Sequence, residues 1–414
     1  MAVESDSRSG KNGTFPWHLG VYDAHCHPTD TMDSLATIKG MKTRILTVMA
    51  TRGQDQDLVT AVADKHGVKS SDPGQWSLDE CIVPCFGWHP WFSHQMYFDD
   101  EETDAGGERR KEQGNLTGDA KLVHYQSVLQ PSRDSLSDED RQTFLSLPDP
   151  TPFFAFLAQT RQHLEHYPYA LIGEIGLDRS FRIPEAWTDN QDLWAKRNHS
   201  LTVGGREGRR LTPFRCSPAH QKKIFKAQLQ LAAEMRRGVS VHGVQAHGLV
   251  LETLQELWRG HEKEVLSKRE RKKRGQDHDH ASVEDDVSHP QQLDDAPKPY
   301  PPRICLHSYS GNASNFKQYL NPAIPAQIFA SFSTAINLSD AMDEETPAAF
   351  EDVVKTVPDH MVLVESDLHT AGEEMDRRIE DIVRRICKVK GWSLEEGVKQ
   401  LGKNWRAFAF GETG

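Results

Sequence analysis

Histidines and carboxylates stand at the ends of short apolar runs in this sequence, where they could bind divalent cations. The first run ends in His25 and His27, which are spaced as His-x-His. On a strand, positions i and i+2 share a face, so both imidazoles can bind one ion. Four further runs also end in a potential ligand, namely Glu174, His242, His307 and Asp367. A buried charge or imidazole needs a partner, so five such strand ends in one register predict a metal site.

The His-x-His motif is weak on its own. The chain holds 20 histidines in 414 residues, and that frequency gives about one such pair by chance. A second pair, His278 and His280, lies in a charged stretch, and we interpret it as a solvated tract. The pair at His25 and His27 carries more weight because it closes an apolar run.

Eight apolar runs bounded by turn residues must position these ligands. They are mostly continuous rather than alternating, which is typical of strands buried on both faces of a parallel sheet. The runs cover residues 19–24, 44–50, 81–87, 170–175, 239–241, 303–306, 327–332 and 361–364. Helices are predicted over residues 218–236, 249–258 and 373–389. The pattern predicts an α/β fold, either a (β/α)8 TIM barrel or a doubly wound open sheet. The ligands favour the barrel, of the metal-dependent hydrolase type, because active sites of barrels lie at C-terminal strand ends.

Three long polar insertions interrupt this pattern, at residues 99–149, 179–215 and 262–302. Such compositions bury little apolar surface, so we expect mobile loops around a single barrel domain spanning residues 1–414. The third insertion contains a basic run at residues 268–274. That run is a solvated charged loop, a nuclear-localisation patch or a nucleic-acid contact.

Bulk properties narrow the class of protein. The formal net charge of -12 argues against a generic duplex-binding surface, but not against an enzyme that holds a few phosphates through metals. Six cysteines without CxxC spacing predict buried free thiols in a reducing compartment. The first residues lack an apolar signal core, and no apolar run approaches the ~20 residues needed to cross a bilayer. We therefore expect an intracellular protein, cytoplasmic or nuclear or both, with no membrane association.

Motifs at most of the strand ends match those of a known family. The matching segments include Asp23-Ala24-His25-Cys26-His27, Gly87-Trp88-His89-Pro90, Ile172-Gly173-Glu174-Ile175-Gly176-Leu177-Asp178, Val241-His242, Leu306-His307-Ser308-Tyr309-Ser310-Gly311 and Val364-Glu365-Ser366-Asp367. In these the chain resembles the TatD-type metal-dependent deoxyribonucleases of the amidohydrolase superfamily. The glycine-framed glutamate and the His-x-x-Ser-Gly motif are the specific ones. The insertions and the Glu-Ser-Asp-Leu-His ending resemble the fungal branch, whose members are often described as interactors of a cell-cycle ubiquitin-ligase subunit.

The resemblance implies roles for the candidate residues. His25, His27, Glu174 and Asp367 would hold one divalent cation, and Glu174, His242 and His307 would hold a second, with Glu174 as the bridge. Zn²⁺, Mn²⁺ and Mg²⁺ all suit a mixed site of this kind. Asp367 would act as general base toward water, and His89 would lie near the scissile phosphate. The implied activity is deoxyribonuclease action on DNA ends, with single-stranded ends as the expected partner. Trp88, Trp91, Trp187 and Trp194 could stack on unpaired bases, although packing explains most of them.

Two departures from the family pattern affect substrate binding. Val244 stands where the family usually has an arginine that meets a phosphate, and Asp367-Leu368-His369-Thr370 replaces the family's Asp-Ser-Pro-Tyr. Arg206, Arg209, Arg210 and His369 are the candidates for compensation. Two alternatives therefore stay open. One is hydrolysis of another ester or amide by the same centre, and the other is an adaptor in cell-cycle control that binds a protein partner through the insertions and keeps a structural or vestigial metal site.

Overall fold

Eight parallel strands form the centre of the molecule. The structure is a computed structural model that describes residues 14–99, 114–132, 135–203, 206–265, 298–342 and 344–411. The strands follow one another around the sheet in the order β1 (Tyr22–Cys26), β2 (Ile45–Met49), β3 (Ile82–Phe86), β7 (Leu171–Asp178), β9 (Val239–Val244), β10 (Arg303–Leu306), β11 (Gln327–Phe332) and β12 (Val362–Val364). Each coincides with one of the eight predicted runs. Their residues are nearly all buried, as expected for strands covered on both faces.

The sheet curls into a nearly closed barrel, so the (β/α)8 prediction is confirmed and the open doubly wound sheet is excluded. The seam between β12 and β1 is joined just beyond β12. There the Asp367 N–H donates to the His25 carbonyl at 3.0 Å, and the His27 N–H donates to the Leu368 carbonyl at 2.8 Å. The buried Asp23 carboxylate adds to this seam by accepting from the Ser366 N–H at 3.1 Å. The first and last strands are therefore tied at the end that carries the predicted ligands.

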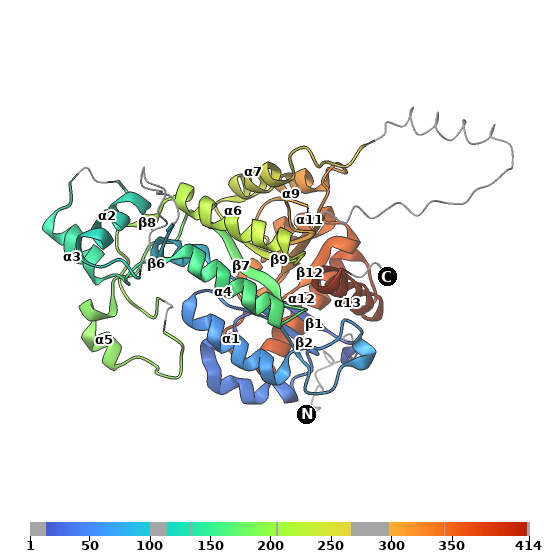
Figure 1. Ribbon diagram of the computed structural model, residues 1–414. Coiled ribbons are helices and arrows are strands. Elements are labelled where there is room, and N and C mark those ends of the chain that lie inside the picture. The colour runs from blue at the N-terminus through green and yellow to red at the C-terminus, as the bar shows by residue number, and fades with distance from the viewer. Residues whose placement is uncertain are drawn as a thin grey trace, which may run out of the picture.

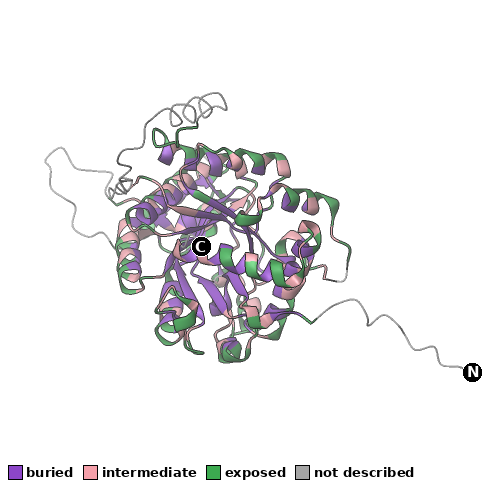
Figure 2. Cartoon of the chain, turned by 90° about the vertical axis from the view of Figure 1, so that its right-hand side faces the viewer, coloured by how far each residue is buried: buried purple, intermediate pink, exposed green. Residues whose placement is uncertain are grey.

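Helices surround the barrel. Figure 2 shows the buried strands inside and helices with exposed outer faces around them. The main covering helices are α1 (Gly53–His66), α4 (Phe153–His166), α6 (Pro218–Glu234), α7 (His247–Trp258), α11 (Ala348–Thr356), α12 (Glu373–Lys390) and α13 (Leu394–Phe410). Shorter turns complete the loops, namely α9 (Ala313–Lys317), α10 (Thr334–Asn337), η2 (Pro28–Gly40) and η4 (Pro90–Gln95). The three predicted helices correspond to α6, α7 and α12. The start of α6 follows from its sequence, because the Ser217 hydroxyl accepts from the His220 N–H and Pro218 stands at the first helical position.

The described parts of the first two insertions form a lobe of helices and short strands beside the barrel, where sequence analysis expected mobile loops. Within residues 99–149 lie α2 (Gly118–Val128), β5 (Leu129–Gln130) and α3 (Asp138–Ser146), and within residues 179–215 lies α5 (Gln191–Ala195). β5 pairs antiparallel with β8 (Arg215–Cys216), which joins the two insertions. Leu122, Tyr125, Phe144 and Phe214 are buried together. Sparse apolar residues in a polar stretch therefore suffice for a small core, because residues from both insertions contribute to it. Figure 1 shows these elements together on one side of the barrel.

Several other predictions concern features apart from the barrel and its ligands. All six cysteines are free and buried, as predicted. No helix among the described residues is long and apolar enough to span a membrane. The basic run at residues 268–274 and the pair His278 and His280 lie outside the described residues.

Candidate metal centre

The barrel brings the six predicted ligands together at its C-terminal end. His25 is in β1 and His27 follows it directly, while Glu174 lies within β7 and His242 within β9. His307 comes directly after β10, and Asp367 follows three residues after the end of β12. All but Asp367 are buried, and Asp367 is half-buried at the floor of a cavity. Strands far apart in the sequence thus deliver their ligands to one point, as the barrel topology requires.

Glycines on either side of Glu174 let β7 approach its neighbours closely. Gly176 has φ of +150°, and a Cβ at this position would overlap the carbonyl of His242 on β9. At Gly173 a Cβ would stand 2.9 Å from the Cβ of Ser240, also on β9. Only glycine allows this spacing. The glycine frame therefore places Glu174 beside His242.

One oxygen of Glu174 faces a first group of donors. Glu174 Oε2 lies 3.3 Å from His25 Nε2 and 3.3 Å from His27 Nε2. Asp367 Oδ1 lies 3.4 Å from His27 Nε2 and 3.7 Å from His25 Nε2. Asp367 adopts φ of 54°, a left-handed conformation that aspartate tolerates better than most residues and that is common at functional sites. These four side chains make a mixed nitrogen and oxygen donor set.

The other oxygen of Glu174 faces a second group of donors. Glu174 Oε1 lies 2.7 Å from His242 Nδ1, 3.0 Å from His307 Nε2 and 3.0 Å from His89 Nε2. His89 Nε2 is also 3.3 Å from His242 Nδ1. Sequence analysis expected His89 near a substrate phosphate, and the structure additionally places it among the donors. Each oxygen of Glu174 thus meets several imidazoles, which is the arrangement that a bridging carboxylate needs.

The charges at this centre would favour a bound cation. Burial alone would raise the pKa of Glu174, but the nearby His89, His307 and His25 bring the pKa well below its usual range. Burial would lower the pKa of His27, but hydrogen bonds with Asp367 and Glu174 raise it to about 10. Without a metal, His27 therefore holds a proton between two ionised carboxylates. A divalent cation would take over this role and release the proton.

Outer partners orient the histidines, and sequence analysis did not assign them. His307 Nδ1 lies 3.1 Å from Glu365 Oε1, and His242 Nε2 lies 3.3 Å from Asp178 Oδ2. His25 Nδ1 lies 2.9 Å from the Ser240 hydroxyl. Carboxylates behind metal-binding imidazoles fix the ring and raise its basicity. The signal in the sequence was position, because Asp178 follows Glu174 by four residues and Glu365 precedes Asp367 by two.

A cavity of about 390 Å³ opens above the donors. On one side it is lined by Asp30, Arg52 and His369, and elsewhere by Trp91, Phe92, Val244 and Ile336. The guanidinium of Arg52 lies 3.6 Å from Asp30 Oδ1, and His369 Nδ1 lies 2.7 Å from Asp30 Oδ2. The cavity therefore combines charged and aromatic lining residues above the metal donors, and the Arg52 guanidinium lies 5.3 Å from the centre of the Phe92 ring.

Arg52 is a lining residue that sequence analysis missed. Of the four proposed compensating residues, only His369 lines the cavity. Arg206 donates to the Arg209 carbonyl, and the Arg209 guanidinium lies 4.5 Å from the Trp187 ring, within the lobe. Arg52 instead stands two residues beyond the predicted run 44–50, at a strand end like the metal donors. Strand-end position was again the usable signal.

Comparisons with known proteins show which family the chain resembles. Residues 22–409 match the family described as TatD related DNase. The chain is 34% identical to the Cut9-interacting protein scn1 of Schizosaccharomyces pombe, over 94% of this chain and 98% of that protein. It is 25% identical to the uncharacterized deoxyribonuclease YMR262W of Saccharomyces cerevisiae, over 84% of this chain and 83% of that protein. Among solved structures, a TatD homologue from Escherichia coli, YJJV, aligns with a TM-score of 0.48 and 15% identity, over 94% of this chain and 97% of that chain.

Proposed function

Because the chain belongs to the TatD related DNase family, we propose that it is a metal-dependent hydrolase that cleaves phosphodiesters at unpaired DNA ends. The observation that carries this proposal is the position of Glu174. Its two oxygens face separate groups of donors at the floor of one cavity. Two divalent cations a few ångströms apart are a recurrent solution for phosphodiester hydrolysis.

The donor groups suggest which residues hold each cation. His25, His27, Glu174 and Asp367 would hold one, and Glu174, His242 and His307 would hold the other, with His89 beside it. Zn²⁺, Mn²⁺ or Mg²⁺ bound there would polarise the phosphodiester and activate water for attack. The outer partners Asp178 and Glu365 keep the imidazoles of His242 and His307 in place for this role.

Asp367 is the group that we assign to proton transfer. Its carboxylate lines the cavity, unlike that of the more deeply placed Glu365. Burial would raise its pKa, but the hydrogen bond with His27 and the charges of His307 and His25 hold it well below the usual range. Asp367 is therefore ionised at neutral pH and able to accept a proton from attacking water.

Arg52 and His369 are the groups that we assign to substrate phosphate. They face the cavity on the side where Asp30 lies between them, and Val244 offers no charge. Arg52 Nη2 is buried, forms ion pairs with Asp55 Oδ1 at 3.3 Å and Asp30 Oδ1 at 3.6 Å, and donates no hydrogen bond among the described residues. A guanidinium that is already desolvated binds a phosphate strongly. Arg52 would thus supply the contact that the family usually takes from the position of Val244.

The test is release of mononucleotides from end-labelled single-stranded DNA by metal-loaded protein, with Mg²⁺, Mn²⁺ or Zn²⁺. We expect release by the wild type and its loss in Asp367→Asn, with the metal content of both proteins measured. Release by a fully metallated Asp367→Asn variant at the wild-type rate would remove Asp367 from proton transfer. If the wild type binds two equivalents of metal and releases nothing, the substrate is another ester or an amide, or the function lies in partner binding.

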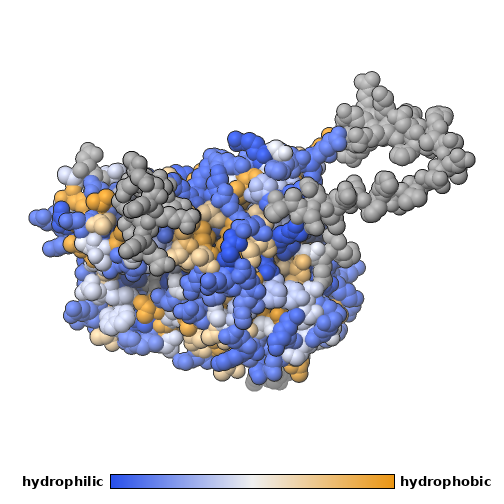
Figure 3. All heavy atoms as spheres, in the orientation of Figure 1, coloured by the Kyte–Doolittle hydropathy of each residue, from blue (hydrophilic) through white to orange (hydrophobic). Residues whose placement is uncertain are grey.

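A second candidate function is protein binding through the lobe. The relative scn1 is named for its interaction with Cut9. In this chain Val123 on α2 and Leu145 on α3 are exposed, and Figure 3 shows hydrophobic atoms on the lobe amid a largely hydrophilic face. Exposed apolar side chains on a built lobe suit a docking surface.

This second function predicts that purified protein binds the Cut9 counterpart of its own organism. Replacing Val123 and Leu145 together by glutamate would abolish binding, whereas Leu78→Glu, at an exposed leucine outside the lobe, would not. Equal binding by all three proteins would exclude the lobe as the docking surface.

A further inference from the structure

Trp91 is an exposed aromatic residue beside the donors. It lies in η4 two residues after His89 and lines the cavity, with 36% of the residue exposed. Its ring is 4.8 Å from the His89 ring, measured between centroids. Part of the indole therefore remains exposed within the cavity, where a ligand can reach it.

The indole is held in one orientation. Its Nε1–H donates to Asp178 Oδ2 at 2.7 Å, and its ring stacks on Phe181 at 4.6 Å with an angle of 9°. The Trp91 N–H also donates to His89 Nδ1 at 3.1 Å. The exposed part of the ring is therefore preorganised. Binding of a flat ligand against it would cost little further conformational entropy of this side chain.

The surroundings of the indole suit one flat ring. Ile336, which is 50% exposed, also lines the cavity, and so do Arg52 and His369, which both contact Asp30. A cavity of about 390 Å³ falls in the size range for a single small ligand. A single nucleobase attached to a phosphate at the metal donors fits a cavity of this size, whereas a base pair in a duplex does not.

Resting on the proposed function, we propose that Trp91, supported by Phe181, binds the nucleobase of the terminal nucleotide whose phosphodiester is cleaved. The base must be unpaired to reach the ring. Stacking is tolerant of sequence because every base has a π face. Trp91 thereby selects frayed or single-stranded ends over paired ends, and it does so without reading base identity.

The test compares two single-stranded oligonucleotides that differ only at their terminal nucleotides, which carry a base in one and are abasic in the other. KM and kcat are measured with the full-length, Mn²⁺-loaded protein. Stacking is worth roughly 1–3 kcal/mol per base. Trp91→Ala should therefore raise KM for the base-bearing oligonucleotide about tenfold to a hundredfold and leave KM for the abasic one unchanged.

Two variants separate stacking from other effects. Trp91→Phe keeps an aromatic ring but loses the hydrogen bond to Asp178, so KM should stay near the wild-type value while kcat falls. Trp194→Ala removes a similarly exposed tryptophan on α5, outside the cavity lining, and should change neither constant. If Trp91→Ala raised KM equally for the base-bearing and the abasic oligonucleotide, the proposal would be overturned. Trp91 would then be a positioning residue for Asp178.

A binding measurement distinguishes failure of the base-site proposal from failure of the proposed nuclease function. If the wild type cleaves neither oligonucleotide with any metal, the proposed nuclease function fails. Fluorescence anisotropy of the same labelled oligonucleotides then decides on Trp91. Tighter binding of the base-bearing ends by the wild type, lost in Trp91→Ala, supports the base site, and equal binding of both oligonucleotides overturns it.

Discussion

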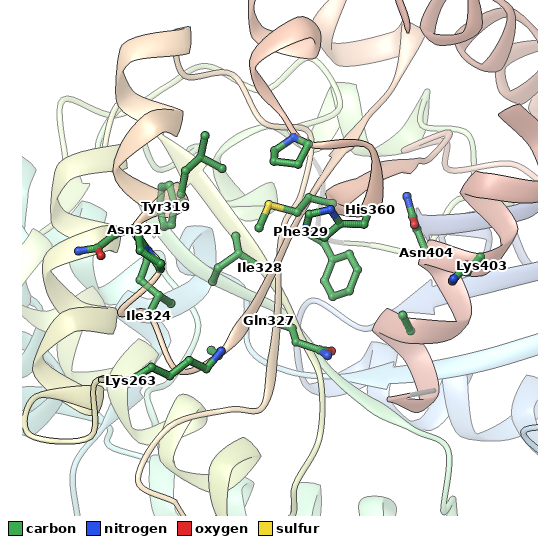
Figure 4. Close-up of a pocket in the computed structure, with 16 residues that line it drawn as sticks. Lys263, Tyr319, Asn321, Ile324, Gln327, Ile328, Phe329, His360, Lys403 and Asn404 are labelled. Atoms are coloured by element: carbon green, nitrogen blue, oxygen red, sulfur yellow. The ribbon is translucent and has the colours of Figure 1, made fainter. Parts of the chain in front are cut away.

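Two cavities at opposite ends of the same strands differ in what they can do. The site cavity, at the C-terminal ends, holds about 390 Å³, whereas an outer hollow at the starts of β11 and β12 holds about 620 Å³. The outer hollow lies between β11, the turn before β12 and α13 (Figure 4), with Ile328, Phe329 and Met361 among its walls. None of its described lining residues is a carboxylate. The smaller cavity is the chemical one because donors converge there, so convergence and not size locates the function.

The largest expected effect comes from removing the bridge in the site cavity. Glu174→Gln removes the charge that both donor groups share, so bound metal and hydrolysis should be lost together. The loss should be well beyond the roughly 10- to 100-fold typical of an outer partner. Metal content by elemental analysis and the initial rate of nucleotide release measure it. A fully metallated and active Glu174→Gln protein would contradict the bridging role.

A smaller effect should follow from the partners behind the ligands. Glu365→Gln preserves the shape of the side chain but removes the charge beside His307 Nδ1. We expect metal affinity to fall roughly 10- to 100-fold. Ser240→Ala is the matched variant, because it removes a neutral hydroxyl from His25 Nδ1, and its effect should be weaker. Competition with a chromogenic chelator measures the metal affinity of both variants. A larger loss of affinity in Ser240→Ala than in Glu365→Gln would show that the outer partner does not act through its charge.

The pH dependence of metal binding should be about tenfold per unit for each proton displaced. The pKa of His27 is raised to about 10 in the metal-free site, because its bonds to Asp367 and Glu174 outweigh burial. His27 is therefore protonated at pH 7, and a metal must displace the proton. Metal affinity should rise as pH increases toward 10 and fall in acid. Calorimetry in buffers of different ionisation enthalpy counts the protons, and zero protons released at pH 7 would contradict this charge state.

The smallest effect on chemistry should come from the outer hollow. Asn404 Nδ2 donates to the carbonyls of Asp359 and Val362 at 2.7 and 2.8 Å. Asn404→Ala leaves these carbonyls without that donor and should lower the free energy of unfolding by about 1–3 kcal/mol. Metal affinity and the rate per folded molecule should not change. Denaturant unfolding and chelator competition test this pair of results, and a loss of metal would mean that the two cavities are coupled.

The barrel and the convergence of the candidate ligands could be predicted from the sequence because both depend on local signals. Buried parallel strands are continuous apolar runs, and a ligand at a strand end is visible as the residue where the run stops. The roles of Arg52 and Asp178 were missed although both stand near strand ends, because only the fold shows that Arg52 lines the cavity and that Asp178 lies behind His242. The lobe was missed because its core joins Leu122 and Phe214, which lie far apart in the chain. Pairing of two insertions has no local signature.

The seam between β1 and β12 sets the order of events during synthesis on the ribosome. His25 and His27 are made early, but their backbone partners at Asp367 and Leu368 are made close to the end. A nascent chain can build most of the strands and still lack both the seam and one cation ligand. The proposed metal centre could therefore be completed only after translation has passed Asp367, so partially made chains would lack the full donor set.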